Sequence, residues 1–195
     1  YDAWSLHALG WATVDTLGTS RTGRTGPRLL TDTIFFARTN NTDEYMLLEN
    51  RQAVLSDTAQ MNPALLSTCP LSGLGFCAKS PGLLFWLVDQ AKVSSGLLGN
   101  SVNAGALQGV ALVQADGLNQ LRVPGARNRG DRGDSYPGTS GNTGLTLLSA
   151  PGAWDNFSEY LGFTVDGIDQ LGAGNMQFRF NRPAPSLGEG GKGAQ

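Results

Sequence analysis

The sequence predicts an α+β protein, predominantly β, in which the end of an N-terminal helix precedes hairpins and a mixed β-sheet with long loops. Three observations lead to this fold class. Short apolar runs alternate with turn dipeptides, one stretch has helical spacing, and 27 of the 195 residues are glycine. Glycine is thus about twice as frequent as usual, which favours many turns between short strands.

The first stretch, residues 2–11, has the apolar spacing of the last turns of a helix. The side chains concerned are Ala3, Trp4, Leu6, Ala8, Leu9 and Trp11. Gly10 suits the C-terminal cap. Because the chain starts inside this pattern, without Met or a signal peptide, we expect a further segment upstream.

A hairpin follows a polar loop at residues 18–26. Its strands are expected at residues 30–37 and 44–51, with a turn at residues 40–43. Alternation in the second strand puts one set of side chains on each face. The two sets are Tyr45, Leu47 and Glu49, and Met46, Leu48 and Asn50.

The middle of the chain predicts further strands. Residues 54–81 read as a loop, and "GLLFWLVDQ" (82–90) reads as a strand buried on both faces. Residues 108–123 predict a strand pair around the turn dipeptide Asp116-Gly117. A long irregular loop is expected at residues 124–143.

A short strand at residues 145–148 and a last hairpin with a turn at Asp166-Gly167 complete the expected fold. In this hairpin "MQFRF" alternates as a half-exposed strand. We therefore expect one β-rich domain at residues 1–182. Residues 183–195 are rich in Gly and Pro and are expected to form a flexible tail or linker.

Composition excludes two classes of partner. The net charge of −2 offers no electrostatic footprint for nucleic acid or for an acidic membrane. The longest apolar run, "GLLFWLV" (82–88), is far too short to span a bilayer.

Catalytic chemistry is restricted by the single histidine, His7. A zinc site of the H-E-x-x-H kind needs two histidines, and two cysteines with one histidine fall short of a closed zinc site. The sequence also lacks a G-x-S-x-G motif and a phosphate-binding loop in the right context. We therefore assign no catalytic residue to this polypeptide.

Carboxylates and amides indicate a calcium site. The candidate ligands are Asp89, Asn103, Asp116, Asp131 and Asp134. Calcium takes six to eight oxygen ligands, and Gly130 and Gly133 let the chain wrap closely enough to offer carbonyls as well. The alternative is that these side chains cap turns and bond nearby backbone amides.

Cys69 and Cys77 flank the Pro- and Gly-rich stretch "PLSGLGF". In a secreted protein they would form a disulfide, and otherwise they are free thiols in an apolar setting. Low Lys content and many Thr, Ser, Asn and Gly residues favour a secreted, extracellular protein.

The stretch "NRGDRGDSYPG" (128–138) contains two overlapping Arg-Gly-Asp triplets. Integrin-type adhesion is one interpretation of them. The alternative is that the triplets are by-products of two Gly-Asp pairs separated by one arginine.

Five stretches, in order, resemble one family: "DAWSLHALGW" (2–11), "EYMLLENRQ" (44–52), "GLLFWLVDQ" (82–90), "GVALVQADG" (109–117) and "GDRGDSYPG" (130–138). They are similar to the downstream half of the catalytic domain of secreted immune-inhibitor-A-type zinc metallopeptidases. In that family the zinc-binding H-E-x-x-H helix lies upstream of the segment resembling residues 2–11. Leu87 departs from the family pattern, because relatives commonly have His in W-H-V-D.

The resemblance implies that this chain is the C-terminal portion of a secreted zinc metalloendopeptidase domain. The chain would form the β-rich wall of the cleft, with zinc held only by the upstream part. The alternative is a non-catalytic extracellular structural or binding subunit derived from that fold. The implied partners are the upstream segment of the same precursor or a protein substrate, with self-assembly as a further option.

The resemblance also implies roles in the fold. Trp4, Trp11, Tyr45, Leu47 and Trp86 would be core residues. Glu49 and Arg51 would form a partly buried ion pair, or else a solvated pair at the edge.

Overall fold

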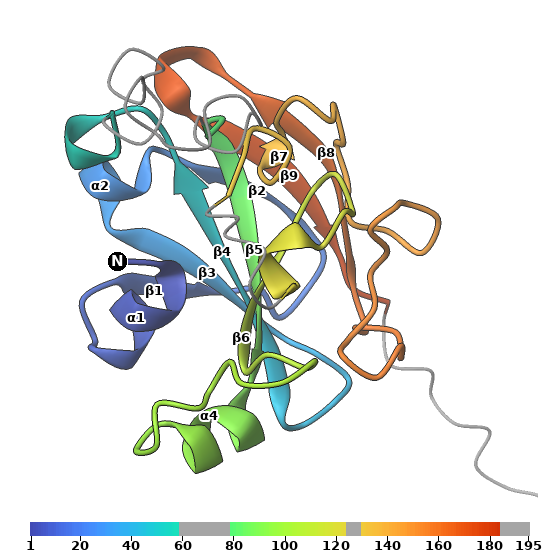
Figure 1. The fold of residues 1–195 in the computed structure, drawn as a ribbon. Coiled ribbons are helices and arrows are strands. Elements are labelled where there is room, and N and C mark those ends of the chain that lie inside the picture. Colours follow the sequence, from blue (N-terminus) through green and yellow to red (C-terminus); the bar gives the residue numbers. More distant parts are fainter. Residues whose placement is uncertain (59–78, 124–129, 184–195) are drawn as a thin grey trace, which may run out of the picture.

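In the computed structural model, which describes residues 1–58, 79–123 and 130–183, the chain forms two β-sheets and a few short helices (Figure 1). One sheet is mixed and has six strands, and the other is antiparallel and has three. This confirms the predicted α+β class with a predominance of strands.

The six-stranded sheet contains the hairpin that the sequence predicts. Its main strands, in spatial order, are β1 (Thr13–Thr16), β3 (Thr33–Arg38), β4 (Glu44–Arg51), β5 (Gly82–Asp89) and β6 (Val110–Val113). The β1–β3 pair is parallel and the other pairs are antiparallel. The two-residue strand β7 (Tyr136–Pro137) pairs with the Gly82 end of β5.

The three-stranded sheet combines one strand from the first part of the chain with two strands from its last part. Strand β9 (Met176–Asn181) lies between β2 (Arg21–Thr25) and β8 (Thr164–Gln170). In β9 the apolar side chains point into the protein and the polar ones point outward, as "MQFRF" predicts.

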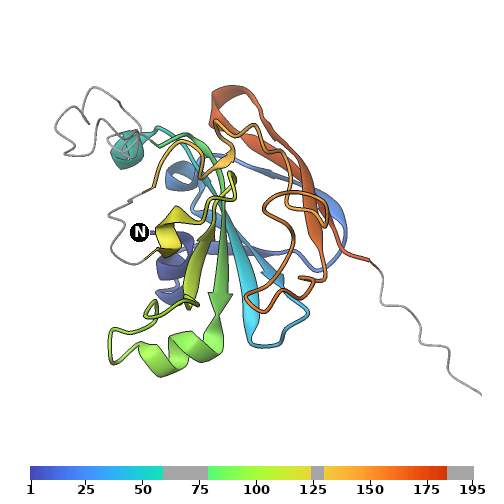
Figure 2. The same cartoon turned by 45° about the vertical axis from the view of Figure 1, so that its right-hand side comes forward.

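The main core lies between the two sheets (Figure 2). Phe35 of β3 meets Phe178 of β9 edge to face, with ring centroids 5.1 Å apart. Strand β5 is buried on both faces, as predicted, because Phe85 packs into this core while Val88 belongs to a second cluster on the opposite face. That second cluster lies between the six-stranded sheet and α1 (Ala3–Ala8).

Helix α1 has complete caps at both ends. The Asp2 side chain accepts a hydrogen bond from the Ser5 N–H over 2.8 Å. At the other end the Gly10 N–H bonds the His7 carbonyl and the Trp11 N–H bonds the Leu6 carbonyl, which is the Schellman pattern. Gly10 has φ +67°, so its role at the helix end is confirmed. The helix begins at Ala3, with Asp2 as its N-terminal cap.

The other helical elements are one or two turns long. Among the described residues they are α2 (Arg28–Thr31), α4 (Gln90–Gly96), η1 (Leu55–Asp57), η3 (Gln120–Arg122) and η4 (Gly172–Gly174). None of the helices formed by the described residues has the length and apolar character needed to cross a membrane.

Several predicted elements are wrong in detail. The expected polar loop at 18–26 contains β2, a mostly exposed strand that exists because β9 pairs with it along its whole length. The segment after Asp116-Gly117 turns into η3 instead of a strand, since Asn119 adopts a left-handed conformation. Residues 145–148 form only isolated bridges.

The last hairpin turns later than predicted. Asp166 and Gly167 lie inside β8, where a register shift before Asp169 marks a β-bulge. Trp11 is also not a core residue, because 57% of it is exposed and its ring meets that of Tyr1. Leu47 is fully buried, and Trp4, Tyr45 and Trp86 are partly buried against the α1 side of the sheet. The expected tail was residues 183–195, and all of it except Pro183 lies outside the described residues.

Candidate metal centre

Three of the five candidate calcium ligands come together in the structure. Asp116 follows β6, and Asp131 and Asp134 lie in the segment that leads into β7. One carboxylate oxygen from each of the three lies within 4.8 Å of the other two. The sequence stretch that contains both Gly-Asp pairs therefore folds back onto the end of β6.

Backbone hydrogen bonds hold this segment in place. The Asp131 N–H donates to Oδ2 of Asp134 over 2.6 Å, and the Gly133 N–H donates to Oδ1 of Asp131 over 2.7 Å. The Asp134 carbonyl accepts from the Ala115 N–H over 3.0 Å, which ties the segment to the strand end. The carboxylates are thus positioned by main-chain contacts, and these need no bound ion.

Glycine is required where the segment crosses Asp116. A Cβ atom on Gly133 would overlap Oδ2 of Asp116 and would lie 3.0 Å from its Cγ atom. Gly130 has φ +95°, a conformation that other residues rarely adopt. Gly133 thus lets the segment pass close to Asp116, and Gly130 allows a backbone conformation that other residues rarely adopt.

Asp134 is the least satisfied member of the cluster. Only 5% of it is exposed, and its buried Oδ1 atom has no hydrogen-bond donor among the described residues. Burial, followed by the charges of Asp131 and Asp116, raises the pKa of Asp134 to about 6, although the Asp131 N–H and Lys79 oppose the shift. A cation at this position would offset both the cost of burying the Asp134 charge and its repulsion by Asp131 and Asp116.

Tyr136 adds a buried hydroxyl near the cluster. Its side chain has no exposed surface, and its hydroxyl has no hydrogen-bond partner in the part of the chain that the structure describes. Burial and, secondarily, the charge of Asp116 raise the pKa of this phenol. Sequence reasoning did not single out Tyr136, since nothing in its sequence context distinguishes it from a core tyrosine.

Asp89 and Asn103 do not join the cluster. The Asp89 side chain caps α4 by accepting from the Lys92 N–H over 2.9 Å. Asn103 exchanges two hydrogen bonds with the backbone of Val110, at the start of β6, whereas Asp116 follows the end of that strand. The turn-capping alternative therefore describes these two residues.

Two further sequence hypotheses concern the Arg-Gly-Asp triplets and the expected disulfide. In the triplet Arg132-Gly133-Asp134 the aspartate is buried, so this triplet does not present the side chain that an adhesion receptor would need. The other triplet begins at Arg129, which lies outside the described residues, as do Cys69 and Cys77 of the expected disulfide.

A pocket with space for about 140 Å³ adjoins the aspartates. Its apolar part is formed by side chains of β5, β6 and η3, and its polar part by charged and hydroxyl groups. The lining residues that matter below are Arg51, Lys79, Leu84, Trp86, Leu112 and Leu121, together with Asp131 and Asp134. Asp131 and Asp134 thus line the pocket, whereas Asp116, the third member of the cluster, does not.

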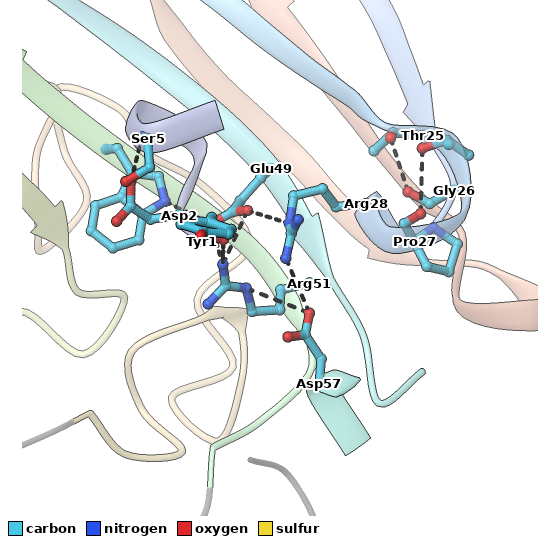
Figure 3. A network of polar contacts seen from close by, with 12 residues as sticks. Tyr1, Asp2, Ser5, Thr25, Gly26, Pro27, Arg28, Glu49, Arg51 and Asp57 are labelled. Atoms are coloured by element: carbon cyan, nitrogen blue, oxygen red, sulfur yellow. Dashed lines mark hydrogen bonds and ion pairs between the residues drawn. The ribbon is translucent and has the colours of Figure 1, made fainter. Parts of the chain in front are cut away.

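Arg51, which lines the pocket, belongs to a network of buried ion pairs (Figure 3). Glu49 has no exposed surface, and its carboxylate lies 2.8 Å from Nε of Arg28 and 3.1 Å from Nη2 of Arg51. The Trp86 indole N–H donates to the same carboxylate over 2.9 Å. Burial raises the pKa of Glu49, and the charges of Arg51 and Arg28 oppose this shift.

Asp57 completes this network. Its Oδ2 atom lies 3.4 Å from Nη2 of Arg28 and 3.8 Å from Nε of Arg51. The expected pairing of Glu49 with Arg51 is confirmed, but it is one part of a larger buried group. Arg28 and Asp57 were missed because they are 29 residues apart in sequence and carry no local pattern.

The donor set of the cluster suits a hard cation. Carboxylate oxygens are the ligands that calcium prefers, and they lie at the edge of a pocket where further oxygens can approach. The cluster contains neither the His nor the Cys side chains that are typical of zinc sites. Comparison with protein-family models, curated proteins and solved structures finds no match to this chain.

Proposed function

We propose that this chain is the β-rich, non-catalytic portion of a secreted zinc metalloendopeptidase domain and that Asp116, Asp131 and Asp134 hold a calcium ion in it. Zinc, the activated water and the general base would come from a segment upstream of residue 1. The chain itself would form a wall of the cleft, and calcium would fix the segment between β6 and β7.

The buried, unpartnered Oδ1 of Asp134 carries the calcium part of this proposal. Three carboxylates whose oxygens lie within 4.8 Å repel one another, and burial strengthens the repulsion. A divalent cation converts this repulsion into attraction and supplies the missing partner of Oδ1. The metallopeptidase part is supported by the five sequence stretches, whose last two contain all three of these aspartates.

The peptidase assignment is tested by producing the chain alone and together with its upstream segment. The chain alone should not cleave a protein substrate such as casein, and the longer protein should do so in a zinc-dependent manner. Cleavage by the chain alone in metal-free buffer would contradict the proposal.

The second candidate is a non-catalytic extracellular structural or binding subunit with the same fold. The observation that favours it is the pocket beside the aspartates, which can bind a partner without any catalytic group. An intact calcium response in a parent protein that lacks an H-E-x-x-H motif upstream would favour this candidate over the peptidase.

A further inference from the structure

The pocket between the ion-pair network and the aspartate cluster has an apolar floor. Trp86 and Leu112 are register partners on β5 and β6, and Leu84 and Leu121 extend the same lining. The Trp86 N–H is engaged by Glu49, so the ring contributes apolar surface. An apolar group of a ligand would gain free energy by leaving water for this floor.

Two cations line the pocket: Arg51, which belongs to the ion-pair network, and Lys79, whose side chain reaches Gly130 beside Asp134. Arg51 is fixed by Glu49 and by the Tyr1 carbonyl, which accepts from its Nη2 atom over 2.9 Å. Burial and the charge of Arg51 lower the pKa of Lys79, and the charges of Asp134 and Asp57 oppose this shift. A carboxylate placed near Arg51 and Lys79 would form charge-assisted contacts and reduce the repulsion between them.

The two aspartates that line the pocket determine when a carboxylate can bind. Without a cation, Asp131 and Asp134 line the pocket and repel an anion. A calcium ion on the cluster would cancel this repulsion and offer a coordination position to an oxygen of the ligand. By thermodynamic linkage, such a ligand would strengthen calcium binding by the same factor.

We propose that this pocket binds small carboxylates that bear an apolar group, and that calcium on the aspartate cluster strengthens their binding. The second clause rests on the proposed calcium site, whereas the first rests on the pocket alone. A branched aliphatic acid of six carbons matches the modest size of the cavity, which has space for about 140 Å³.

The test is a ligand-observed NMR titration of the full 195-residue chain with 4-methylpentanoate, once in buffer with calcium and once in buffer with a chelator. Acetate removes the apolar group, 4-methylpentanamide removes the charge, and 3-methylbutylamine reverses it. We expect saturable binding of 4-methylpentanoate, a Kd at least threefold lower in calcium, and weaker binding of the other three compounds.

Matched variants separate the pocket from general charge effects. Lys79→Gln should raise the Kd for 4-methylpentanoate about tenfold, the scale of one charge-assisted contact. Arg132→Gln removes an exposed cation from the neighbouring segment, outside the pocket lining, and should change the Kd less than twofold.

The outcomes distinguish the two proposals. If calcium raises Tm but 4-methylpentanoate does not bind, or binds no better than the amide or the amine, the pocket proposal is wrong while the calcium site stands. If the carboxylate binds equally well in calcium and in chelator, its coupling to calcium is wrong. If Tm is also unchanged by calcium, the calcium site is wrong as well.

Discussion

The backbone N–H of Asp131 donates to Oδ2 of Asp134 over 2.6 Å, while the buried Oδ1 of the same carboxylate has no donor within residues 1–58, 79–123 and 130–183. One oxygen of Asp134 is thus positioned by the fold and the other lacks a partner. A buried polar atom in this state is unfavourable unless a ligand satisfies it. In the ion-free protein this carboxylate therefore lowers the free energy of unfolding.

Replacing Asp134 with asparagine should reveal this lost stability. In the presence of a chelator at pH 7.5, Asp134→Asn should increase the free energy of unfolding by about 1–3 kcal/mol, because it removes a buried charge. The same variant should lose the stabilisation by calcium. Urea unfolding with and without calcium measures both effects, and a variant that is destabilised in chelator would contradict this account.

The pH dependence of this difference has a definite sign. The folded-state pKa of about 6 lies above the unfolded value of about 3.9. Between these values the folded state holds the proton more tightly, so the stability of the wild-type protein relative to Asp134→Asn falls as the pH rises from 4 to 6. The total change is about 3 kcal/mol, and it should level off above pH 6. If the free energies of unfolding of the two proteins changed in parallel between pH 4 and 6, Asp134 would not have the raised pKa.

Gly133→Ala should weaken calcium binding through a steric effect alone. Its Cβ would overlap Oδ2 of Asp116 and move that carboxylate away from the cluster. We expect the Kd for calcium to rise at least tenfold, as measured by calorimetric titration. Gly18→Ala is the control, because a Cβ there meets nothing within 4 Å, and it should leave the Kd unchanged.

Asp89 should affect stability without affecting calcium. Asp89→Ala removes the side-chain cap of α4 and should cost about 1 kcal/mol in the free energy of unfolding. The increase in Tm caused by calcium should stay the same as in the wild-type protein. A smaller increase would show that Asp89 participates in ion binding after all.

The ion-pair network should behave as a buried unit. Glu49→Gln leaves Arg28 and Arg51 without their shared anion and should cost about 3–5 kcal/mol. The control is Asp15→Asn, which breaks an exposed pair with Arg21 and should cost less than about 1 kcal/mol. Equal losses in the two variants, measured by chemical unfolding, would contradict the distinction between buried and exposed pairs.

The elements that the sequence predicts well are those with their own local signals. Strands β3 and β4 alternate on either side of a polar turn, and β5 is a continuous apolar run. Strands β1 and β2 lack such a signal, because "TVDT" and "RTGRT" are mostly exposed. Strand β1 forms by pairing with β3, and β2 forms by pairing with β9, which is distant from it in the sequence.

The candidate site divides in the same way. Asp131 and Asp134 are recognisable from their glycine spacing, and Asp116 from its position after a strand. Asp89 and Asn103 have the same chemistry, yet nearby backbone groups take up their hydrogen-bonding capacity. Arg28 reaches Glu49 because α2 packs beside β4, and Asp57 joins the network through Arg28. No local sequence pattern encodes these contacts.

The most direct test of the central claim is a calcium titration of the unmodified chain, followed by thermal unfolding in calcium and in chelator. We predict one calcium ion per chain and, at a calcium concentration of 100 times the Kd, an increase in Tm of roughly 5–10 °C. This increase should disappear in Asp134→Asn. An unchanged Tm, together with no measurable heat of calcium binding, would show that Asp116, Asp131 and Asp134 do not form a calcium site.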